Sequence, residues 1–137
     1  MRFLNRMEGL DLINSVKLKI WSREFTLPID YDCLEGEAPT QDQVNALDGF
    51  LAHPEWVDKA KTQVESYCKK ALLEDEANQK KDNVFSYVIP ESVFVKCGER
   101  HPRVALLCKY RYDLEHGLAV VFQADGKLQV GTQDIIL

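Results

Sequence analysis

Residues 103–130 carry the sequence RVALLCKYRYDLEHGLAVVFQADGKLQV, and the spacing of its apolar residues decides the fold class. Apolar or aromatic side chains occupy every even position of 104–112, which is the alternation of a β-strand. A second alternation covers 118–122 and leads into Asp125-Gly126, a preferred turn of tight β-hairpins, before apolar residues return from 128 onwards. The stretch therefore predicts a strand over 103–112 followed by a β-hairpin.

Strand patterns also occur in two places upstream. Residues 16–31 alternate on either side of Trp21-Ser22-Arg23-Glu24, which predicts another β-hairpin. Residues 84–89 and 93–97 form two further apolar runs, with Pro90 after the first. Because proline donates no hydrogen bond to a strand ladder, we expect the first run to be at most an edge strand and the second to be a regular strand.

Two helices are predicted between these groups of strands. Thr40 and Gln43 have the spacing of a capping box, and apolar residues then recur on one helical face, so a first helix is expected over 41–52. Pro54 cannot continue that helix but suits the first turn of another. The period of the apolar residues that follow predicts a second helix over 54–78.

The order of these elements predicts a single α+β domain over residues 1–137. Two strands, two helices and about four strands (ββααββββ) suggest an antiparallel sheet with both helices packed on one face. A chain of 137 residues, 45% of them hydrophobic, is long enough to bury one such core.

The composition indicates which cell compartment the protein occupies and which cofactor classes it lacks signatures for. No apolar run approaches the roughly 18 to 20 residues of a membrane-spanning helix, and Glu8 and Asp11 interrupt the place where a signal peptide would have its apolar core. The cysteines are widely spaced, and no Gly-rich phosphate loop follows a predicted strand. We therefore expect a cytoplasmic protein with reduced thiols that uses no metal, cofactor or membrane.

The acidic residues are unevenly distributed along the chain. The net charge is −5, yet residues 24–58 contain nine acids and no lysine or arginine. Such a region repels phosphates and speeds the approach of a basic protein partner, although a solvated face with no partner is the simpler interpretation. The nine acids are Glu24, Asp30, Asp32, Glu35, Glu37, Asp42, Asp48, Glu55 and Asp58.

The densest group of titratable side chains is Asp113, Glu115 and His116, between two predicted strands. A histidine beside two carboxylates could serve a small hydrolase that works by acid/base or metal-assisted chemistry. Neighbouring residues of a strand point to opposite faces, however, and Gly117 favours a turn, so a structural connection is the other interpretation. The sequence identifies no nucleophile, and we predict no catalytic residue.

Aromatic residues raise two further binding functions. Tyr110 and Tyr112 alternate with Lys109 and Arg111, so the aromatic and basic side chains occupy opposite faces, and with a net charge of −5 we predict no nucleic-acid binding. Trp21 and Trp56 could be core residues or aromatic anchors of a protein interface.

Several segments together resemble a family of small, largely uncharacterised bacterial α+β proteins. This family includes immunity proteins of contact-dependent and polymorphic toxin systems. The similarity spans about residues 16–134 and consists of core and turn residues, so it identifies a fold more than an activity. The segments that carry it are Trp21-Ser22-Arg23-Glu24-Phe25 with Leu27 and Ile29, Gln41 and Gln43 with Phe50-Leu51, Tyr67, residues 88–92, residues 115–122 and residues 130–134.

The resemblance implies a protein that binds a cognate toxin in the cytosol of the producing cell and blocks it, with no catalytic residues of its own. Together with the charge pattern, it predicts a basic toxin as the partner. A small hydrolase centred on His116 and a housekeeping domain with an unknown ligand are the alternatives. The predicted toxin-binding residues are Asp30, Asp32, Glu35, Glu37, Asp42 and Asp48, with Trp21 or Trp56 as aromatic anchors.

Overall fold

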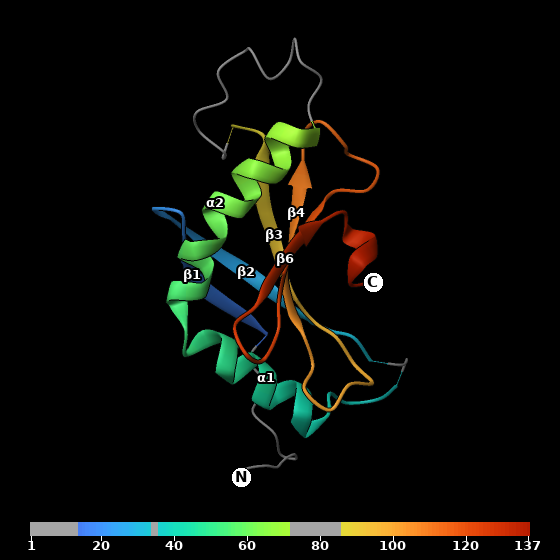
Figure 1. The fold of residues 1–137 in the computed structure, drawn as a ribbon. Coiled ribbons are helices and arrows are strands. Elements are labelled where there is room, and N and C mark those ends of the chain that lie inside the picture. The colour runs from blue at the N-terminus through green and yellow to red at the C-terminus, as the bar shows by residue number, and fades with distance from the viewer. Residues whose placement is uncertain (1–13, 34–35, 72–85) are drawn as a thin grey trace.

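The computed structural model describes residues 14–33, 36–71 and 86–137 of the chain. They form one six-stranded sheet, in which the spatial order of the strands follows the sequence, together with two α-helices (Figure 1). The α+β class is therefore confirmed, and a short 3₁₀-helix that was not predicted closes the chain. The elements in chain order are β1 (Ser15–Ile20), β2 (Arg23–Tyr31), α1 (Gln41–Leu51), α2 (Pro54–Ala71), β3 (Val88–Val95), β4 (Val104–Tyr110), β5 (Leu118–Phe122), β6 (Leu128–Gly131) and η2 (Gln133–Ile135).

The sheet is mixed, so the prediction of a purely antiparallel sheet was wrong. Four neighbouring pairs are antiparallel, but β2 and β3 run parallel, with Ile29 beside Val93 and Tyr31 beside Val95. The physical reason is the connection between these strands: α1 and α2 carry the chain back to the end of the sheet where β2 began, so β3 starts in the same direction. Apolar periodicity carries no information on strand direction.

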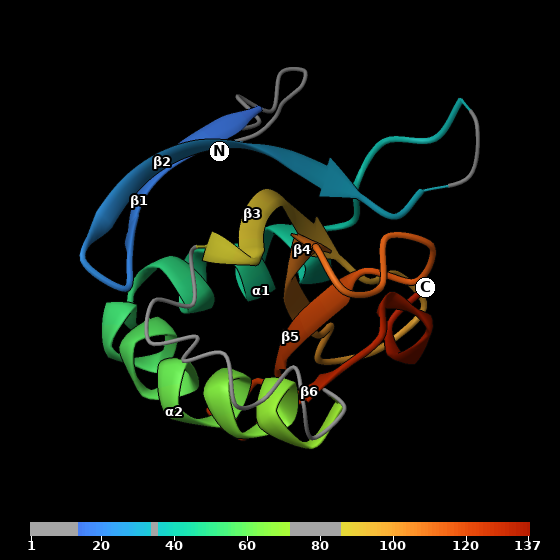
Figure 2. The same cartoon turned by 90° about the horizontal axis from the view of Figure 1, so that it is seen from above.

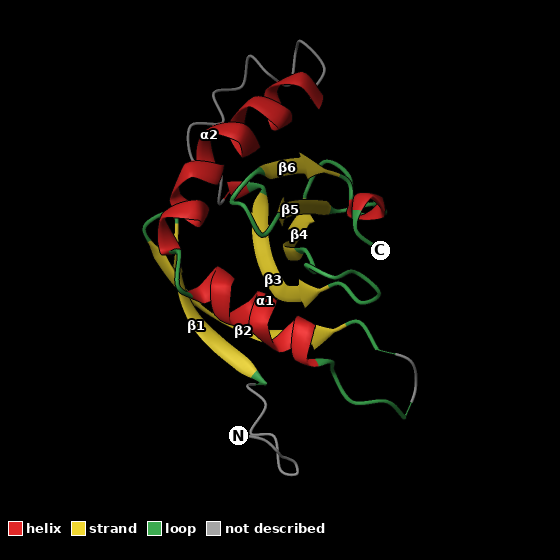
Figure 3. Ribbon diagram, turned by 60° about the horizontal axis from the view of Figure 1, so that its bottom comes forward, coloured by secondary structure: helices red, strands yellow, loops and turns green. Residues whose placement is uncertain are grey.

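The two faces of the sheet are covered differently. Both helices contribute to one apolar core with the inward side chains of all six strands, and Figure 2 shows the β1–β2 hairpin arching around this side. A smaller cluster on the opposite face joins Phe94, Leu107 and Val121 to Ile136. Figure 3 shows the short C-terminal helix η2 beside β5. The helices therefore share one face, and the C-terminal residues cover the other. None of the described helices is long and apolar enough to cross a membrane.

β3 lies between β2 and β4, but its pairing with β2 begins only at Val93. Residues 88–90 therefore pair with β4 alone, which agrees with the expectation of an edge strand before Pro90. The two predicted runs are one strand over Val88–Val95, and residues 84 and 85 of the first run lie outside the described residues. The register with β4 shifts between Pro90 and Ser92. Proline has no N–H, and it is tolerated here because this part of β3 has a free side and adjoins a bulge.

The helix starts follow the sequence signals. The Thr40 hydroxyl accepts a hydrogen bond from the Gln43 N–H at 3.1 Å, and the Gln43 side chain accepts one from the Thr40 N–H at 2.9 Å, which completes the predicted capping box. α1 ends at Leu51, one residue before its predicted end, and α2 begins at Pro54. The predicted continuation of α2 from 72 to 78 lies outside the described residues.

Gln43 also joins α1 to the parallel strands. Its side chain is 1% exposed, and its Nε2 donates to the carbonyls of Asp32 at 2.9 Å and Val95 at 3.2 Å. One buried amide therefore serves the helix cap and the ends of β2 and β3 at once. This contact fixes α1 against the sheet at the point where a pocket opens.

Candidate binding pocket and acidic surface

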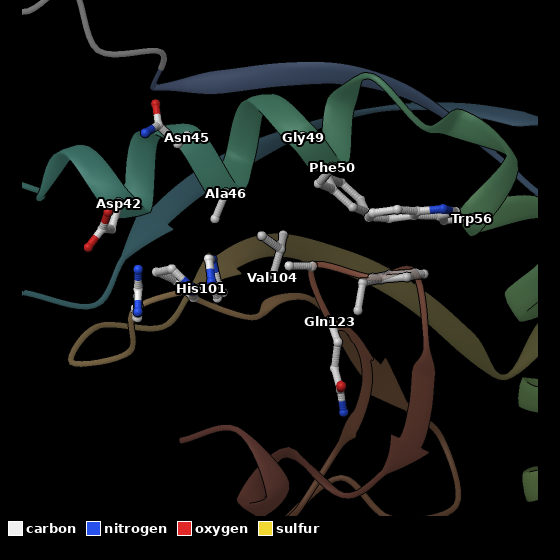
Figure 4. Close-up of a pocket in the computed structure, with 13 residues that line it drawn as sticks. Asp42, Asn45, Ala46, Gly49, Phe50, Trp56, His101, Val104 and Gln123 are labelled. Atoms are coloured by element: carbon white, nitrogen blue, oxygen red, sulfur yellow. The ribbon is translucent and has the colours of Figure 1, made fainter.

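A pocket of about 290 Å³ lies between α1, the β3–β4 connection and the end of β5. We call it the aromatic pocket. Figure 4 shows Ala46 and Phe50 pointing from α1 towards Val104, while Trp56 closes one end and Asp42 and His101 face each other at the other. The pocket exists because α1, the start of α2 and two sheet connections, β3–β4 and β5–β6, meet at the same end of the fold.

Aromatic rings form the closed end of the pocket. Trp56 stacks on His53, with ring centroids 4.4 Å apart and planes 4° apart, and it lies near Phe122 at 6.5 Å. Phe122 in turn contacts Phe50, with centroids 5.1 Å apart. A Cβ at Gly126 would meet the Trp56 ring at 3.0 Å, so the β5–β6 turn also holds this ring in place. The wall is thus fixed before any ligand arrives.

Charged side chains stand at the open end. Asp42 projects from the first turn of α1, whereas Arg100 and His101 belong to the β3–β4 connection. No ion pair joins Asp42 to Arg100 among the described residues, so both groups face solvent at the rim. A second, more open hollow of about 380 Å³ continues from His101 and Gln123 towards Glu99 and Asp125. Together the two hollows form a groove with an apolar end and a polar end.

Most of the predicted toxin-binding acids are exposed and lack a salt bridge within the described part of the chain. Burial, then the nearby Cys97, and then the charges of Asp32, Glu37 and Asp30 raise the pKa of the Cys33 thiol, so these acids gather around the end of β2. Burial and then the Asp48 carboxylate raise the pKa of Tyr31 in the same region. We call Asp30, Glu37, Asp42 and Asp48 the acidic surface.

Three of the predicted residues belong neither to that surface nor to the aromatic pocket. Asp32 is occupied by Lys96 at 3.6 Å and by the Cys97 N–H at 3.3 Å. Although burial opposes it, these hydrogen bonds and the Lys96 charge lower the pKa of Asp32. Trp21 is 4% exposed and donates its indole N–H to the Val57 carbonyl at 2.9 Å, so it is a core residue and the proposed anchor role is wrong. Glu35 lies outside the described residues.

The turn at Asp113–His116 has a local structural explanation. The His116 Nδ1 lies 3.0 Å from the Asp113 Oδ1, and the same oxygen accepts the His116 N–H at 3.2 Å. Gly117 then donates its N–H to the Asp113 carbonyl at 2.8 Å, with a φ of +63° that suits glycine. Neither of the two hollows is lined by Asp113, Glu115 or His116. The geometry therefore accounts for these residues as a closed turn.

This pair predicts a pH dependence that can be measured. The hydrogen bond and charge of Asp113 raise the pKa of His116, and the hydrogen bonds from the His116 backbone and ring lower the pKa of Asp113. The stabilisation from His116 is fully present below the pKa of an unfolded histidine and is lost as the pH rises through the folded value. That from Asp113 is present above the pKa of an unfolded carboxyl and is lost as the pH falls through the folded value.

An NMR titration of the His116 ring is expected to show this raised pKa, and Asp113→Asn is expected to lower it. The matched variant Glu115→Gln removes an equal charge without removing a hydrogen bond, so it is expected to lower the pKa of His116 less. Equal effects of the two variants would contradict the paired geometry.

Most residues that line the pocket could not be recognised from the sequence. Ala46 and Gly49 are small residues of α1, and Arg100 and His101 belong to a connection whose position no periodicity reveals. One signal was present: Gly49 interrupts a helix interior, where glycine is unfavourable relative to alanine. Asp42 and Trp56 were predicted separately, and the structure brings them to one pocket.

The described residues hold no group of three His, Cys, Asp or Glu side chains placed to bind a metal ion. The four cysteines, Cys33, Cys68, Cys97 and Cys108, are free thiols, and burial raises the pKa of Cys68 to about 11.

A family model described as a domain of unknown function, DUF6985, matches residues 10–137, and the chain belongs to this family. Searches of curated proteins and of solved structures gave no match. The family description assigns no activity, so the function must be argued from the site.

Proposed function

We propose that this DUF6985 domain is an immunity protein, which binds a basic bacterial toxin in the cytosol of the producing cell and blocks it without catalysis. The observation that carries the proposal is the acidic surface, together with the one of its acids that lines the aromatic pocket. Asp42 belongs to both, so a partner that approaches the charge also meets an apolar recess. Interfaces commonly combine an aromatic anchor site with a charged rim in this way.

The charges support a basic partner in particular. The exposed carboxylates at the end of β2 and along α1 form no ion pair with other described residues and keep their hydration until a partner binds. Their combined field attracts positive charge over about 10 Å at moderate salt. Toxins that act on nucleic acids are commonly basic, because they bind phosphates. An acidic inhibitor surface therefore speeds the capture of such a toxin before it reaches its substrate.

The hydrolase alternative has less support. Asp113 and His116 form a pair with the spacing of a catalytic dyad, but their hydrogen bonds close a turn and neither hollow adjoins them. A housekeeping domain with a different ligand would use the same pocket without needing the acidic surface. An immunity protein and a housekeeping domain can thus be distinguished by testing whether the acids of the acidic surface affect binding.

The proposal predicts a slow association when the acidic surface is neutralised. The candidate partner is the protein encoded next to this gene, and co-expression of the wild-type chain is expected to relieve its toxicity to a bacterial host. A variant with Asp30→Asn, Glu37→Gln, Asp42→Asn and Asp48→Asn is expected to bind about tenfold more slowly or worse at low salt, with a smaller change in dissociation rate.

The matched control removes four exposed acids elsewhere, at Glu24, Glu91, Glu115 and Asp134. It has the same net charge as the test variant, and its association rate is expected to stay within about threefold of wild type. Equal rates for the two variants would reject the acidic surface, and a lack of any rescue by the wild-type chain would reject the immunity function.

A further inference from the structure

We propose that the aromatic pocket receives an aromatic side chain from an exposed loop of the partner, with the main chain of that loop lying over Asp42 and Arg100. The inference rests on the proposed function only in naming the partner as a protein. The pocket itself, and the chemistry of its occupant, follow from the residues that line it.

The closed end suits an aromatic ring. The volume of the whole pocket, about 290 Å³, is at the lower end of the range for ligand pockets. It fits one large side chain better than a cofactor. The partly exposed Trp56 presents its ring to an occupant, and Phe50 and Phe122, 2% and 1% exposed, pack behind it. Aromatic pairs gain stabilisation beyond the area that they bury. Because His53 and Gly126 hold the Trp56 ring, little side-chain entropy is lost when an occupant enters.

Gly49 leaves the pocket open at a cost to the helix. It lies within α1, its φ is not positive, and a Cβ built on it would meet nothing within 4 Å. Neither backbone conformation nor packing therefore requires glycine here, although glycine weakens a helix interior. Close approach of an occupant to the helix backbone is a use that accounts for the missing side chain.

The open end suits a peptide main chain. Asp42 presents hydrogen-bond acceptors, and Arg100 and His101 on the facing connection present donors, so N–H and C=O groups of one extended segment find partners on opposite walls. The adjoining hollow towards Glu99 and Asp125 gives such a segment room to continue. Asp42 also joins this rim to the acidic surface, which matches a loop on a basic protein.

Binding can be tested on the whole chain without the natural partner. The probes are the capped tripeptides acetyl-Gly-Phe-Gly-amide and acetyl-Gly-Ala-Gly-amide, titrated while amide and indole signals are followed by NMR. The phenylalanine peptide is expected to shift Ala46, Gly49 and the Trp56 indole, with a Kd of about 1 mM. The alanine peptide is expected to bind at least about tenfold more weakly, because it leaves the ring site empty.

Two variants at one position separate pocket filling from folding. Gly49→Met places a long side chain in the pocket and is expected to weaken binding of the phenylalanine peptide at least about tenfold. Gly49→Ala is expected to raise Tm and, because its single methyl group obstructs the close approach only in part, to weaken binding by about threefold. Equal binding of both peptides, or unchanged binding by a folded Gly49→Met variant, would overturn the inference. If Gly49→Met still captures the toxin with wild-type affinity, the pocket inference fails while the immunity function survives.

Discussion

Replacing Gln43 by leucine is expected to lower the free energy of unfolding by about 3 kcal/mol, although the two side chains have similar volumes. The Gln43 amide is 1% exposed and donates to Asp32 and Val95 while accepting from the Thr40 N–H. Leucine offers no hydrogen bond, so the Asp32 carbonyl loses its partner at a cost of roughly 1 to 3 kcal/mol. Loss of the capping box at the exposed Thr40 adds about 1 kcal/mol. Urea unfolding measures the change.

The control for this prediction is Gln41→Leu at the start of the same helix. Gln41 is exposed and donates to the Asn45 side chain at 2.9 Å, so its loss is expected to change stability by less than about 0.5 kcal/mol. A Gln43→Leu variant as stable as Gln41→Leu would show that the amide does not hold α1 to the ends of the parallel strands. The pocket wall would then need another explanation.

Gly117→Ala is expected to destabilise the fold by about 3 kcal/mol, the second large effect. Its φ is +63°, and a Cβ there would lie 2.6 Å from the Gln133 Nε2 and 3.0 Å from the Cys108 carbonyl oxygen. The Gln133 side chain could move only by giving up its own hydrogen bond to that carbonyl at 3.1 Å. Backbone strain and overpacking therefore add together.

Gly98→Ala separates the cost of backbone strain from the cost of overpacking. Gly98 has a comparable φ of +77°, but a Cβ there would meet nothing within 4 Å. Its substitution is expected to cost only the backbone term of about 1 to 2 kcal/mol in the same thermal or urea unfolding experiment. Equal losses at both positions would mean that the C-terminal residues shift to accommodate the methyl group added at Gly117 at no cost.

The elements of this fold could be predicted from sequence where local chemistry decides them. The capping box at Thr40 and the strands β4 and β5 each depend on neighbouring residues, and all are present in the structure. β5 is buried on both faces, however, because the C-terminal residues cover the second one. The direction of β3 relative to β2 depends on the path of a connection of more than fifty residues. The apolar periodicity of a strand carries no information on that path. Pro90 marked the part of β3 that pairs on one side only, but periodicity did not show that the runs on either side of it form one strand.

The candidate site was only partly predictable. The acids of the acidic surface could be recognised as a charge pattern in the sequence. The charge of an exposed carboxylate does not depend on tertiary contacts. Trp21 and Trp56 looked equivalent in sequence, yet one lies in a turn whose two residues have positive φ and is buried against α2, and the other lines the pocket. Contacts between distant segments decide that difference, as they decide the position of His101.

The fold explains how a small domain can present such a site. Gln43 anchors α1, the Trp56 ring is held by His53 and Gly126, and the β3–β4 connection supplies the facing wall. The charged and apolar parts of the proposed interface therefore both depend on the position of α1. Rigid positioning of this kind favours a tight complex, since little ordering is needed on binding.

Hydrogen–deuterium exchange of the chain, alone and bound to the toxin encoded beside its gene, tests the proposed interface most directly. Protection is expected at residues 40–56 and 98–104. These segments contain α1 with Asp42 and Asp48, and the two walls of the aromatic pocket. Protection confined to the outer side of the β1–β2 hairpin or to the Asp113–His116 turn, with residues 40–56 unchanged, would contradict it.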